Sequence, residues 1–289
     1  MRTVLVTGAS SGIGRDAALF LNERGYQVVG TVRKPADGEA LMADAAHPDL
    51  LHAVHCDVTS ADDVAALAAR VAQVAGDDGL FAMFSNAGVA NGQGDVSAEG
   101  TPVEALERLM RINYLGSVRV IQAHLPMLRA SKGTLVINTA LMTRTVMPFN
   151  GGYAPSKAAL EAWADQLRRE VRPHGVHVCC IRAAAIATPI EAKQDASTVP
   201  DDGPYPGQRA YIEGGLTLMR KQSGKAKLQP RRVSELVARL IESRHPKRKP
   251  IVGGMSRPIW LVGGLPLPMQ DALLARMVTR MERAGAPQP

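Results

Sequence analysis

Short apolar runs alternate with longer amphipathic segments along most of the chain. The runs are rich in β-branched residues, which is typical of strands buried on both faces of a parallel sheet. Strands are predicted at 3–7, 27–32, 50–55, 80–84, 133–139, 176–181 and 249–252. Helices are predicted at 15–24, 61–74, 103–128, 153–171, 230–243 and 267–283. This alternation predicts the α/β class: a doubly wound, mostly parallel, seven-stranded sheet with helices on both faces.

The last third of the chain departs from this rhythm. From 182 to about 227 the sequence is loop-like, with prolines at 189, 200, 204 and 206. We expect the stretch at about 186–230 to form a lid that selects the substrate, and about 253–289 to form a C-terminal helical extension. No repeat or low-complexity tract divides the chain. We therefore expect a single domain over 1–289.

A glycine-rich turn joins the first strand to the first helix. Residues 8–14 are Gly8, Ala9, Ser10, Ser11, Gly12, Ile13 and Gly14. Glycines at such a turn let the backbone approach a pyrophosphate, and the helix N-terminus offers free N–H groups with partial positive charge. A glycine pattern alone is weak, but the strand–turn–helix context makes it specific. The turn predicts a dinucleotide site.

The end of the second strand bears on which dinucleotide is bound. An acidic residue there would bind the adenosine ribose hydroxyls. This chain has Arg33 and Lys34 instead. Because guanidinium and ammonium groups can meet a 2′-phosphate, we predict NADPH over NADH. The alternative is that Arg33 is only a surface loop residue.

Polar and small residues follow the third and fourth strands. Asp57, with Val58, could accept a hydrogen bond from an adenine amino group. It could equally cap the helix that starts near Ser60, a task that Asp62 or Ser60 could share. The fourth strand ends in Ser85, Asn86, Ala87 and Gly88. A small-residue turn at the carboxyl end of a parallel strand is expected beside the ligand crevice.

Asn113 lies in the middle of the helix predicted at 103–128. Asparagine is a poor helix former, because its side chain competes for backbone hydrogen bonds. It could be a solvated residue, or it could mark a bent helix with a freed carbonyl.

Tyr153 and Lys157 are four residues apart in an Ala-rich stretch that predicts a helix. Their side chains therefore share a face, one turn apart. A phenol has a free pKa of about 10, and an ammonium group within about 4–6 Å lowers it. The pair can then exchange a proton near neutral pH. The alternative is an amphipathic helix that happens to carry both residues.

Composition excludes several function classes. The chain is 46% hydrophobic and 21% charged, as an ordinary globular protein is. The net charge of +7 comes without a basic stripe interleaved with aromatics, so we expect no nucleic-acid partner. No apolar run reaches the roughly 18 residues of a transmembrane span. The chain shows no signal peptide, and its three cysteines favour a reducing, cytoplasmic location. His52, His55 and Cys56 could bind a metal, but scattered histidines on a half-buried strand are favoured, and no metal is predicted.

Together these motifs resemble the short-chain dehydrogenase/reductase family. The residues that carry the resemblance are Thr7 to Gly14, Asp57 and Val58, Asn86 to Gly88, Asn113, and Tyr153-Ala-Pro-Ser-Lys157. Their order and spacing agree over about residues 3–188. The C-terminal third looks, more weakly, like the retinol- and hydroxysteroid-dehydrogenase-like members. The resemblance implies a Rossmann fold and, through the long helices at 103–128 and 153–171, a homodimer or homotetramer.

The resemblance also implies a mechanism. Hydride would pass between the nicotinamide of NADP(H) and a substrate carbonyl carbon, and Tyr153 would give or take the proton. Lys157 would lower the tyrosine pKa and bond the nicotinamide ribose, and Asn113 would support a proton-relaying water. Thr188, with Ile186 beside it, would hold the nicotinamide carboxamide.

Two departures from the family pattern stand out. The family has a serine thirteen residues before the tyrosine, where this chain has Ala140; Thr139 or Thr143 could substitute, and Thr139 is our candidate. The family also has Pro-Gly where this chain has Ala183 and Ala184. Loss of one oriented donor can cost about 10²–10³ in rate.

Three functional hypotheses follow. The first is an NADPH-dependent carbonyl reductase or alcohol dehydrogenase for a bulky apolar substrate, because we expect few charges to line the lid apart from Glu191, Lys193 and its acidic turn. The second is other chemistry on the same scaffold, such as imine or enone reduction, isomerisation, dehydration or cyclisation, which Ala140 favours. The third is a non-catalytic NADP-binding or scaffold protein, against which Tyr153 and Lys157 speak.

Overall fold

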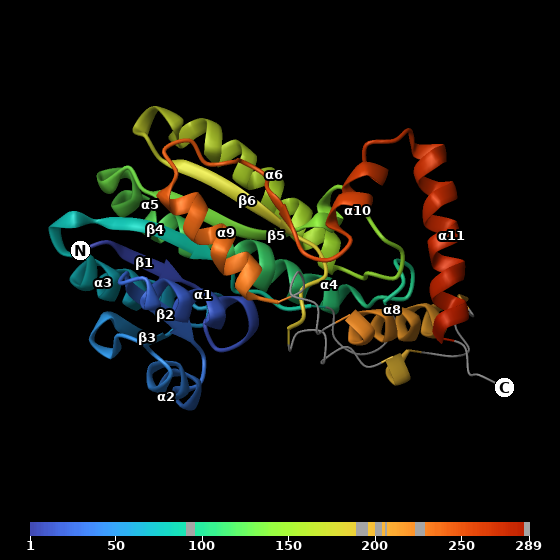
Figure 1. Ribbon diagram of the computed structural model, residues 1–289, viewed down its shortest axis with the longest axis horizontal. Coiled ribbons are helices and arrows are strands. Elements are labelled where there is room, and N and C mark those ends of the chain that lie inside the picture. The colour runs from blue at the N-terminus through green and yellow to red at the C-terminus, as the bar shows by residue number, and fades with distance from the viewer. Residues whose placement is uncertain (91–95, 189–195, 200–203, 206, 223–228, 286–289) are drawn as a thin grey trace.

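The computed structural model describes residues 1–90, 96–188, 196–199, 204–205, 207–222 and 229–285 (Figure 1). Most of the expected lid prolines, and Glu191 and Lys193, lie outside these residues.

Seven strands form one parallel sheet at the centre of the molecule (Figure 1). The strands are β1 (Thr3–Val6), β2 (Gln27–Val32), β3 (Leu51–His55), β4 (Leu80–Ser85), β5 (Thr134–Ala140), β6 (His177–Ala183) and β7 (Ile251–Val252). Their order across the sheet is β3-β2-β1-β4-β5-β6-β7. The chain therefore winds outward in both directions from the β1–β4 pair, and such a reversal opens a crevice at the carboxyl ends of the strands. The predicted doubly wound, seven-stranded sheet is confirmed.

Helices cover both faces of the sheet (Figure 1). The helices of the described residues are α1 (Gly12–Glu23), α2 (Pro35–Ala43), α3 (Ala61–Ala75), α4 (Val103–Leu109), α5 (Ser117–Ser131), α6 (Tyr153–Val171), α8 (Gln208–Gln222), α9 (Arg231–Glu242), α10 (Ser256–Val262) and α11 (Leu267–Gly285). A π-helix, η3 (Met110–Gly116), joins α4 to α5, and a single 3₁₀ turn, η4 (Leu141–Thr143), follows β5. No helix of the described ranges is long and apolar enough to cross a bilayer.

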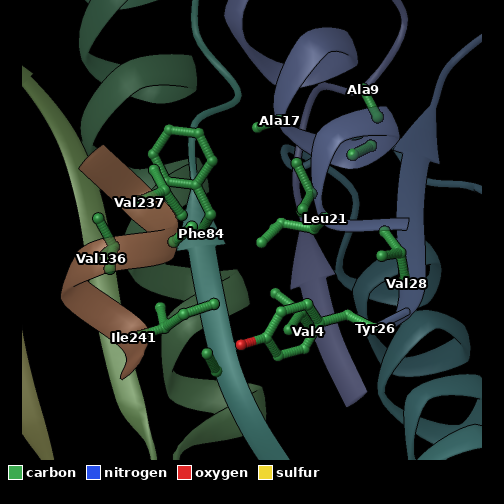
Figure 2. Close-up of a cluster of buried hydrophobic side chains, with 14 of the residues drawn as sticks. Val4, Ala9, Ala17, Leu21, Tyr26, Val28, Phe84, Val136, Val237 and Ile241 are labelled. Atoms are coloured by element: carbon green, nitrogen blue, oxygen red, sulfur yellow. The ribbon is translucent and has the colours of Figure 1, made fainter. Parts of the chain in front are cut away.

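Alternate residues of each strand supply two separate cores. Figure 2 shows Val4, Phe84 and Val136 packed under Leu21 of α1 and Ile241 of α9. On the opposite face, Leu5, Met83 and Ile137 pack under α3, α5 and α6. Because successive side chains of a strand point to opposite faces, a strand covered on both sides must be apolar throughout. For this reason the strands predicted from the sequence agree closely with the observed strand bounds.

The predictions outside the sheet needed three corrections. The loop-like stretch after 182 contains α8, whose Gly214 and Gly215 weaken its helical pattern. Gly214 is there for packing, since a Cβ on it would lie 1.9 Å from the carbonyl oxygen of Met281 on α11. The single helix expected at 103–128 is interrupted by η3. The short helices α2 and α10 were not predicted at all.

Candidate functional site

A groove of about 890 Å³ opens at the carboxyl ends of the central strands. Most of the predicted site residues line it: Gly8, Ser10, Ser11, Gly12, Ile13, Arg33, Asp57, Val58, Asn86, Ala87, Gly88, Thr139, Tyr153, Lys157, Ile186 and Thr188. Three predicted residues, Gly14, Lys34 and Asn113, are not part of its lining. The crevice that the strand order creates is therefore the place where the sequence motifs converge.

The glycine turn is fixed to the end of β4 by hydrogen bonds. The Thr7 hydroxyl accepts from the backbone N–H groups of Asn86 and Ala87, each at 2.9 Å. Gly8 has a φ of +70°, and a Cβ there would lie 2.9 Å from Ala87 Cα. A Cβ on Gly14 would lie 2.1 Å from the carbonyl oxygen of Gly8. Gly8 lets the turn approach the backbone of Ala87, and Gly14 lets α1 approach the carbonyl of Gly8. Gly14 does not line the groove itself.

The N-terminus of α1 faces the groove as a potential anion site. Ser11 is the N-cap residue, and its side chain makes no capping hydrogen bond. Ser11, Gly12 and Ile13 line the groove. The unpaired N–H groups of a first helical turn, together with the helix dipole, favour a phosphate at such a position.

The part of the groove beside the ends of β2 and β3 carries Arg33 and Asp57. One Asp57 carboxylate oxygen accepts from the Thr59 backbone N–H at 2.8 Å and from its hydroxyl at 2.7 Å, and these bonds lower the pKa of Asp57. The nearby Arg33 lowers it further. The helix that follows is capped by Ser60, which accepts from the N–H of Asp63 at 3.1 Å. Of the two roles considered for Asp57, capping thus falls to Ser60.

Asn113 is buried at the π-helical bend rather than solvated. Its side-chain oxygen accepts from Val89 N–H at 2.8 Å, and its amide donates to Val89 O at 2.9 Å and to Ser156 Oγ at 3.0 Å. Its carbonyl accepts from the Ser117 hydroxyl at 2.9 Å. Asn113 is therefore not solvated. It lies in a π-helical interruption of the predicted helix that directs its side chain towards α6, and its carbonyl is not left free.

Lys157 and Tyr153 project from the first two turns of α6 into the groove. Lys157 is 4% exposed, and its Nζ donates to Asn138 O at 2.9 Å. A Cβ on Gly88 would lie 3.3 Å from that Nζ and 3.0 Å from Asn113 Oδ1. Burial lowers the pKa of Lys157 to about 8. The absence of a side chain at Gly88 lets a lysine and an asparagine converge beside Tyr153.

The two threonine hydroxyls beside Ala140 are directed away from the serine position. Thr139 Oγ1 lies 3.0 Å from Ile181 O and 3.2 Å from Glu161 Oε2. Thr143 Oγ1 lies 2.8 Å from the same Glu161 oxygen and 2.9 Å from Ala140 O. Since a hydroxyl donates only one hydrogen bond, both donors can be satisfied within the protein. This geometry does not favour the predicted catalytic role of Thr139.

The second departure, Ala183 and Ala184, keeps regular strand geometry. Ala184 N–H donates to Val252 O at 2.8 Å, which extends the pairing of β6 with β7. Both alanines line the groove.

Several lining residues were missed by the sequence analysis. They include Thr59, Val89, Ala90, Arg108, Arg111, Ile112 and Asn138. Arg108 and Arg111 carry a signal that could have been used, because they stand five and two residues before Asn113, where the predicted helix is interrupted, and both line the groove. With Arg33 and Lys157 they place four cations around a groove whose lining, among the described residues, has Asp57 as its carboxylate. Such a charge balance fits a polyanionic dinucleotide.

These features define a dinucleotide-binding α/β protein with a tyrosine–lysine pair in its ligand groove. The family model described as short chain dehydrogenase matches residues 2–198. The chain belongs to this oxidoreductase family, whose members use nicotinamide cofactors.

Individual proteins share the similarity over nearly the whole chain. Retinol dehydrogenase 5 of Mus musculus is 30% identical over 290 residues, which cover 96% of this chain and 89% of that protein. A short-chain dehydrogenase from Streptomyces avermitilis superposes with a TM-score of 0.75 at 23% identity, covering 96% of each chain. A short chain dehydrogenase from Burkholderia cenocepacia in complex with NADP has a TM-score of 0.69 at 23% identity, covering 96% of this chain and 99% of that one.

Proposed function

We propose that the protein transfers hydride between NADPH and a carbonyl or alcohol group of a bulky apolar substrate, with Tyr153 as proton donor and acceptor. The observation that carries this proposal is the buried Lys157 ammonium, which lines the same groove as Tyr153 one helical turn away. Burial of a charged group costs free energy, so a charged group this deeply buried indicates a functional site.

The chain's own residues would handle the proton. Bound NADPH supplies the hydride. Tyr153 gives its phenolic proton to the carbonyl oxygen in reduction and takes it back in oxidation. Lys157 holds positive charge beside that phenol and bonds the nicotinamide ribose. Asn113, held by Val89 and Ser156, supports a water that returns protons to Lys157.

The cofactor would lie along the groove in a defined orientation. Ser10 to Ile13 bind the pyrophosphate at the start of α1, and Asp57 and Val58 meet the adenine. Asn86, Ala87 and Gly88 line the adenosine side. Ile186 and Thr188 hold the carboxamide. All of these residues line the groove.

NADPH is preferred over NADH because of the cations at the adenosine end. Arg33, and Lys34 beside it, are exposed, and Arg33 lines the groove. The Burkholderia cenocepacia relative described in complex with NADP supports the same choice. The mouse relative is named a retinol dehydrogenase, which supports a bulky apolar substrate for this chain as well.

Substitution of Tyr153 tests the proposal. Tyr153→Phe should lower NADPH-dependent reduction of a panel of ketones and aldehydes by about 10²–10⁴-fold, the usual contribution of a positioned acid. Tyr26→Phe is the matched control, because its hydroxyl bonds Glu242 at 2.9 Å outside the groove. NADPH binding, followed by fluorescence, should survive both changes. Equal activity of the two variants would contradict the proposal and favour a non-catalytic NADP-binding role.

A second candidate is different chemistry on the same site, such as imine or enone reduction, isomerisation, dehydration or cyclisation. It is favoured by Ala140 together with the inward hydrogen bonds of Thr139 and Thr143. Product formation without net change in NADPH absorbance would support isomerisation, dehydration or cyclisation. A large gain in ketone reduction by Ala140→Ser would indicate that the native reaction does not need that hydroxyl.

We further propose a single cytoplasmic domain that assembles as a homodimer or homotetramer, with 186–230 as lid. The free thiols of Cys56, Cys179 and Cys180 support a reducing compartment. Sedimentation velocity of the purified chain tests the assembly.

A further inference from the structure

One carboxylate beside the site accepts hydrogen bonds from four residues in different segments of the chain. Glu161 lies on α6 one turn after Lys157 and two turns after Tyr153, and it is 5% exposed. Arg182 at the end of β6 donates to it at 3.1 Å, and Lys249, just before β7, donates at 2.9 Å. Thr139 on β5 and Thr143 on η4 direct their hydroxyls to its other oxygen. No residue of this group was singled out for this role from the sequence.

The charged groups of this cluster keep their charges over a wide pH range. Hydrogen bonds from Arg182, Lys249 and Thr143 lower the pKa of Glu161 to about 2 against the effect of burial. Asp165, which also pairs with Arg168, supplies the second negative charge to Lys249. The neighbouring Cys180 thiol has its pKa raised to about 12 by burial. Nothing in the cluster changes charge near neutral pH, so it acts as a fixed connection.

The cluster connects α6, which carries Tyr153, to the end of β5 and to η4, and Thr139 of this segment lines the same groove as Tyr153. Ala140 lies between Thr139 and Thr143, and both of these are held by Glu161. Ala140 is 4% exposed, so this segment is closely packed. Ala140 carries no hydroxyl, so at this position the placement of the segment, and not a hydrogen bond, would orient a substrate carbonyl beside Tyr153. The position of η4 relative to α6 therefore matters more here than in a site with a serine.

We propose that Glu161 and Thr143 are positioning residues for the reaction at Tyr153. Their hydrogen bond holds η4 against α6 and thereby sets the distance between Ala140 and the Tyr153 phenol. This inference deepens the proposed function and rests on it.

Thr143→Val is the decisive variant, because it keeps the shape of the side chain and removes one hydroxyl. We expect kcat for a carbonyl substrate to fall about tenfold or more, since displacement of a wall by about 1 Å can cost 10² in rate. NADPH affinity and Tm should stay near the wild-type values, because Glu161 keeps Arg182 and Lys249. Thr143→Ser restores the hydroxyl and should restore kcat. Thr279→Val is the control, since that exposed threonine bonds only Ala275 O on α11.

Amide hydrogen exchange provides a readout independent of turnover. Thr143→Val should accelerate exchange in η4 and leave exchange in β1 unchanged, and Thr279→Val should do neither. Glu161→Gln should accelerate exchange in η4 further. This variant should also lower Tm, because it leaves the charges of Arg182 and Lys249 uncompensated.

The outcomes separate this inference from the proposed function. An active wild type with unchanged kcat and unchanged η4 exchange in Thr143→Val would overturn the positioning role alone. A kcat loss that Thr143→Ser does not rescue would overturn it as well. A wild type that reduces no carbonyl, and equals Tyr153→Phe, would overturn both.

Discussion

The central sheet and the C-terminal helices are both rich in apolar residues, but the sheet buries them and the helices leave many exposed. Leu5, Val29 and Phe84 are 0% exposed. In α10 and α11, by contrast, Leu261 is 62% and Leu267 is 70% exposed. Burial of apolar surface stabilises a fold by about 25 cal/mol per Å², so exposed leucines contribute little to stability. The same residue type therefore holds the fold together in one region and serves another purpose in the other.

The C-terminal helix α10 is attached to the segment that follows β5 and η4 rather than to the sheet core. Thr145, just after η4, donates to Ile259 O of α10 at 2.9 Å, and Arg144 donates to Trp260 O at 3.2 Å. In Figure 1, α11 stands at the end of the molecule next to α8, away from β3. Changes in the sheet should therefore affect folding and cofactor binding. Changes at the contacts of α10 with Thr145 and of α8 with Phe149 should affect substrate use, whereas changes on the exposed face of α11 should not.

Paired leucine substitutions give the largest expected contrast. Leu21→Ala, in the core of Figure 2, should lower the free energy of unfolding by about 2–5 kcal/mol, because it leaves a cavity. Leu267→Ala should change it by less than about 0.5 kcal/mol, as exposed substitutions do. Denaturant unfolding followed by circular dichroism measures both. A comparable cost for the two would mean that α11 is buried against something in solution.

The second-largest expected effect is a pH dependence of stability that arises from Lys157. The sheet region buries the ammonium group of this residue as well as apolar side chains, whereas the C-terminal helices leave even leucines exposed. The folded pKa of about 8 lies below the unfolded value of 10.5. Below pH 8 the lysine is protonated in both states, and its burial penalty is fully present. As pH rises from about 8 to 10.5, only the folded form loses the proton, so stability should increase by up to about 3 kcal/mol.

Lys157→Met isolates this contribution from other titrating groups. The difference in unfolding free energy between wild type and this variant, measured without cofactor at several pH values, should change only across that window. A difference that is flat with pH would show that the ammonium is solvated in the folded state.

Two helical glycines extend the comparison to the backbone. Gly14→Ala on α1 should destabilise by about 1–3 kcal/mol and weaken NADPH binding, because its Cβ would meet Gly8 O. Gly215→Ala on α8 has no atom within 4 Å of the new Cβ. It should stabilise by up to about 1 kcal/mol through helix propensity. Thermal unfolding of both variants checks the opposite signs, and a loss in Gly215→Ala would contradict the packing described for α8.

The sheet and the motif residues could be predicted because each is set by local pattern. A strand covered on both faces, such as β4, requires an unbroken apolar run, and a turn under a cofactor requires glycines such as Gly8. The same logic located Lys157 and Tyr153, since one helical turn fixes their common face.

The parts that were not predicted depend on contacts between distant segments. The helix α8 exists because Gly214 lets it approach α11, a pairing that no local window reveals. The inward direction of the Thr139 and Thr143 hydroxyls is set by Glu161, about twenty residues later in the chain. Lys34 adjoins Arg33 in sequence, but only Arg33 reaches the groove lining.

An aromatic contact gives the smallest expected effect and tests where the two regions meet. Phe149, four residues before Tyr153, packs edge-on against Tyr205 and Tyr211, with centroids 5.7 Å and 5.4 Å away. Its φ of +54° is unusual for a bulky residue, and such strain persists only where surrounding contacts enforce it. The contacts of Phe149 with Tyr211 of α8 and with Tyr205, which precedes α8, therefore hold the loop before Tyr153 in place.

Phe149→Leu should remove two aromatic pairs worth about 0.5–1.5 kcal/mol each while it keeps an apolar side chain. Because these pairs hold the loop before Tyr153 against Tyr205 and against Tyr211 of α8, we expect a higher KM for the carbonyl substrate and an unchanged affinity for NADPH. Phe20→Leu is the control, since Phe20 on α1 stacks with Arg24 and Arg231 at the opposite face. Steady-state kinetics with each ligand varied separates the two effects. If Phe149→Leu weakened NADPH binding as much as substrate binding, the cofactor and substrate regions would be one coupled unit, and the division drawn between the sheet and the C-terminal helices would not hold.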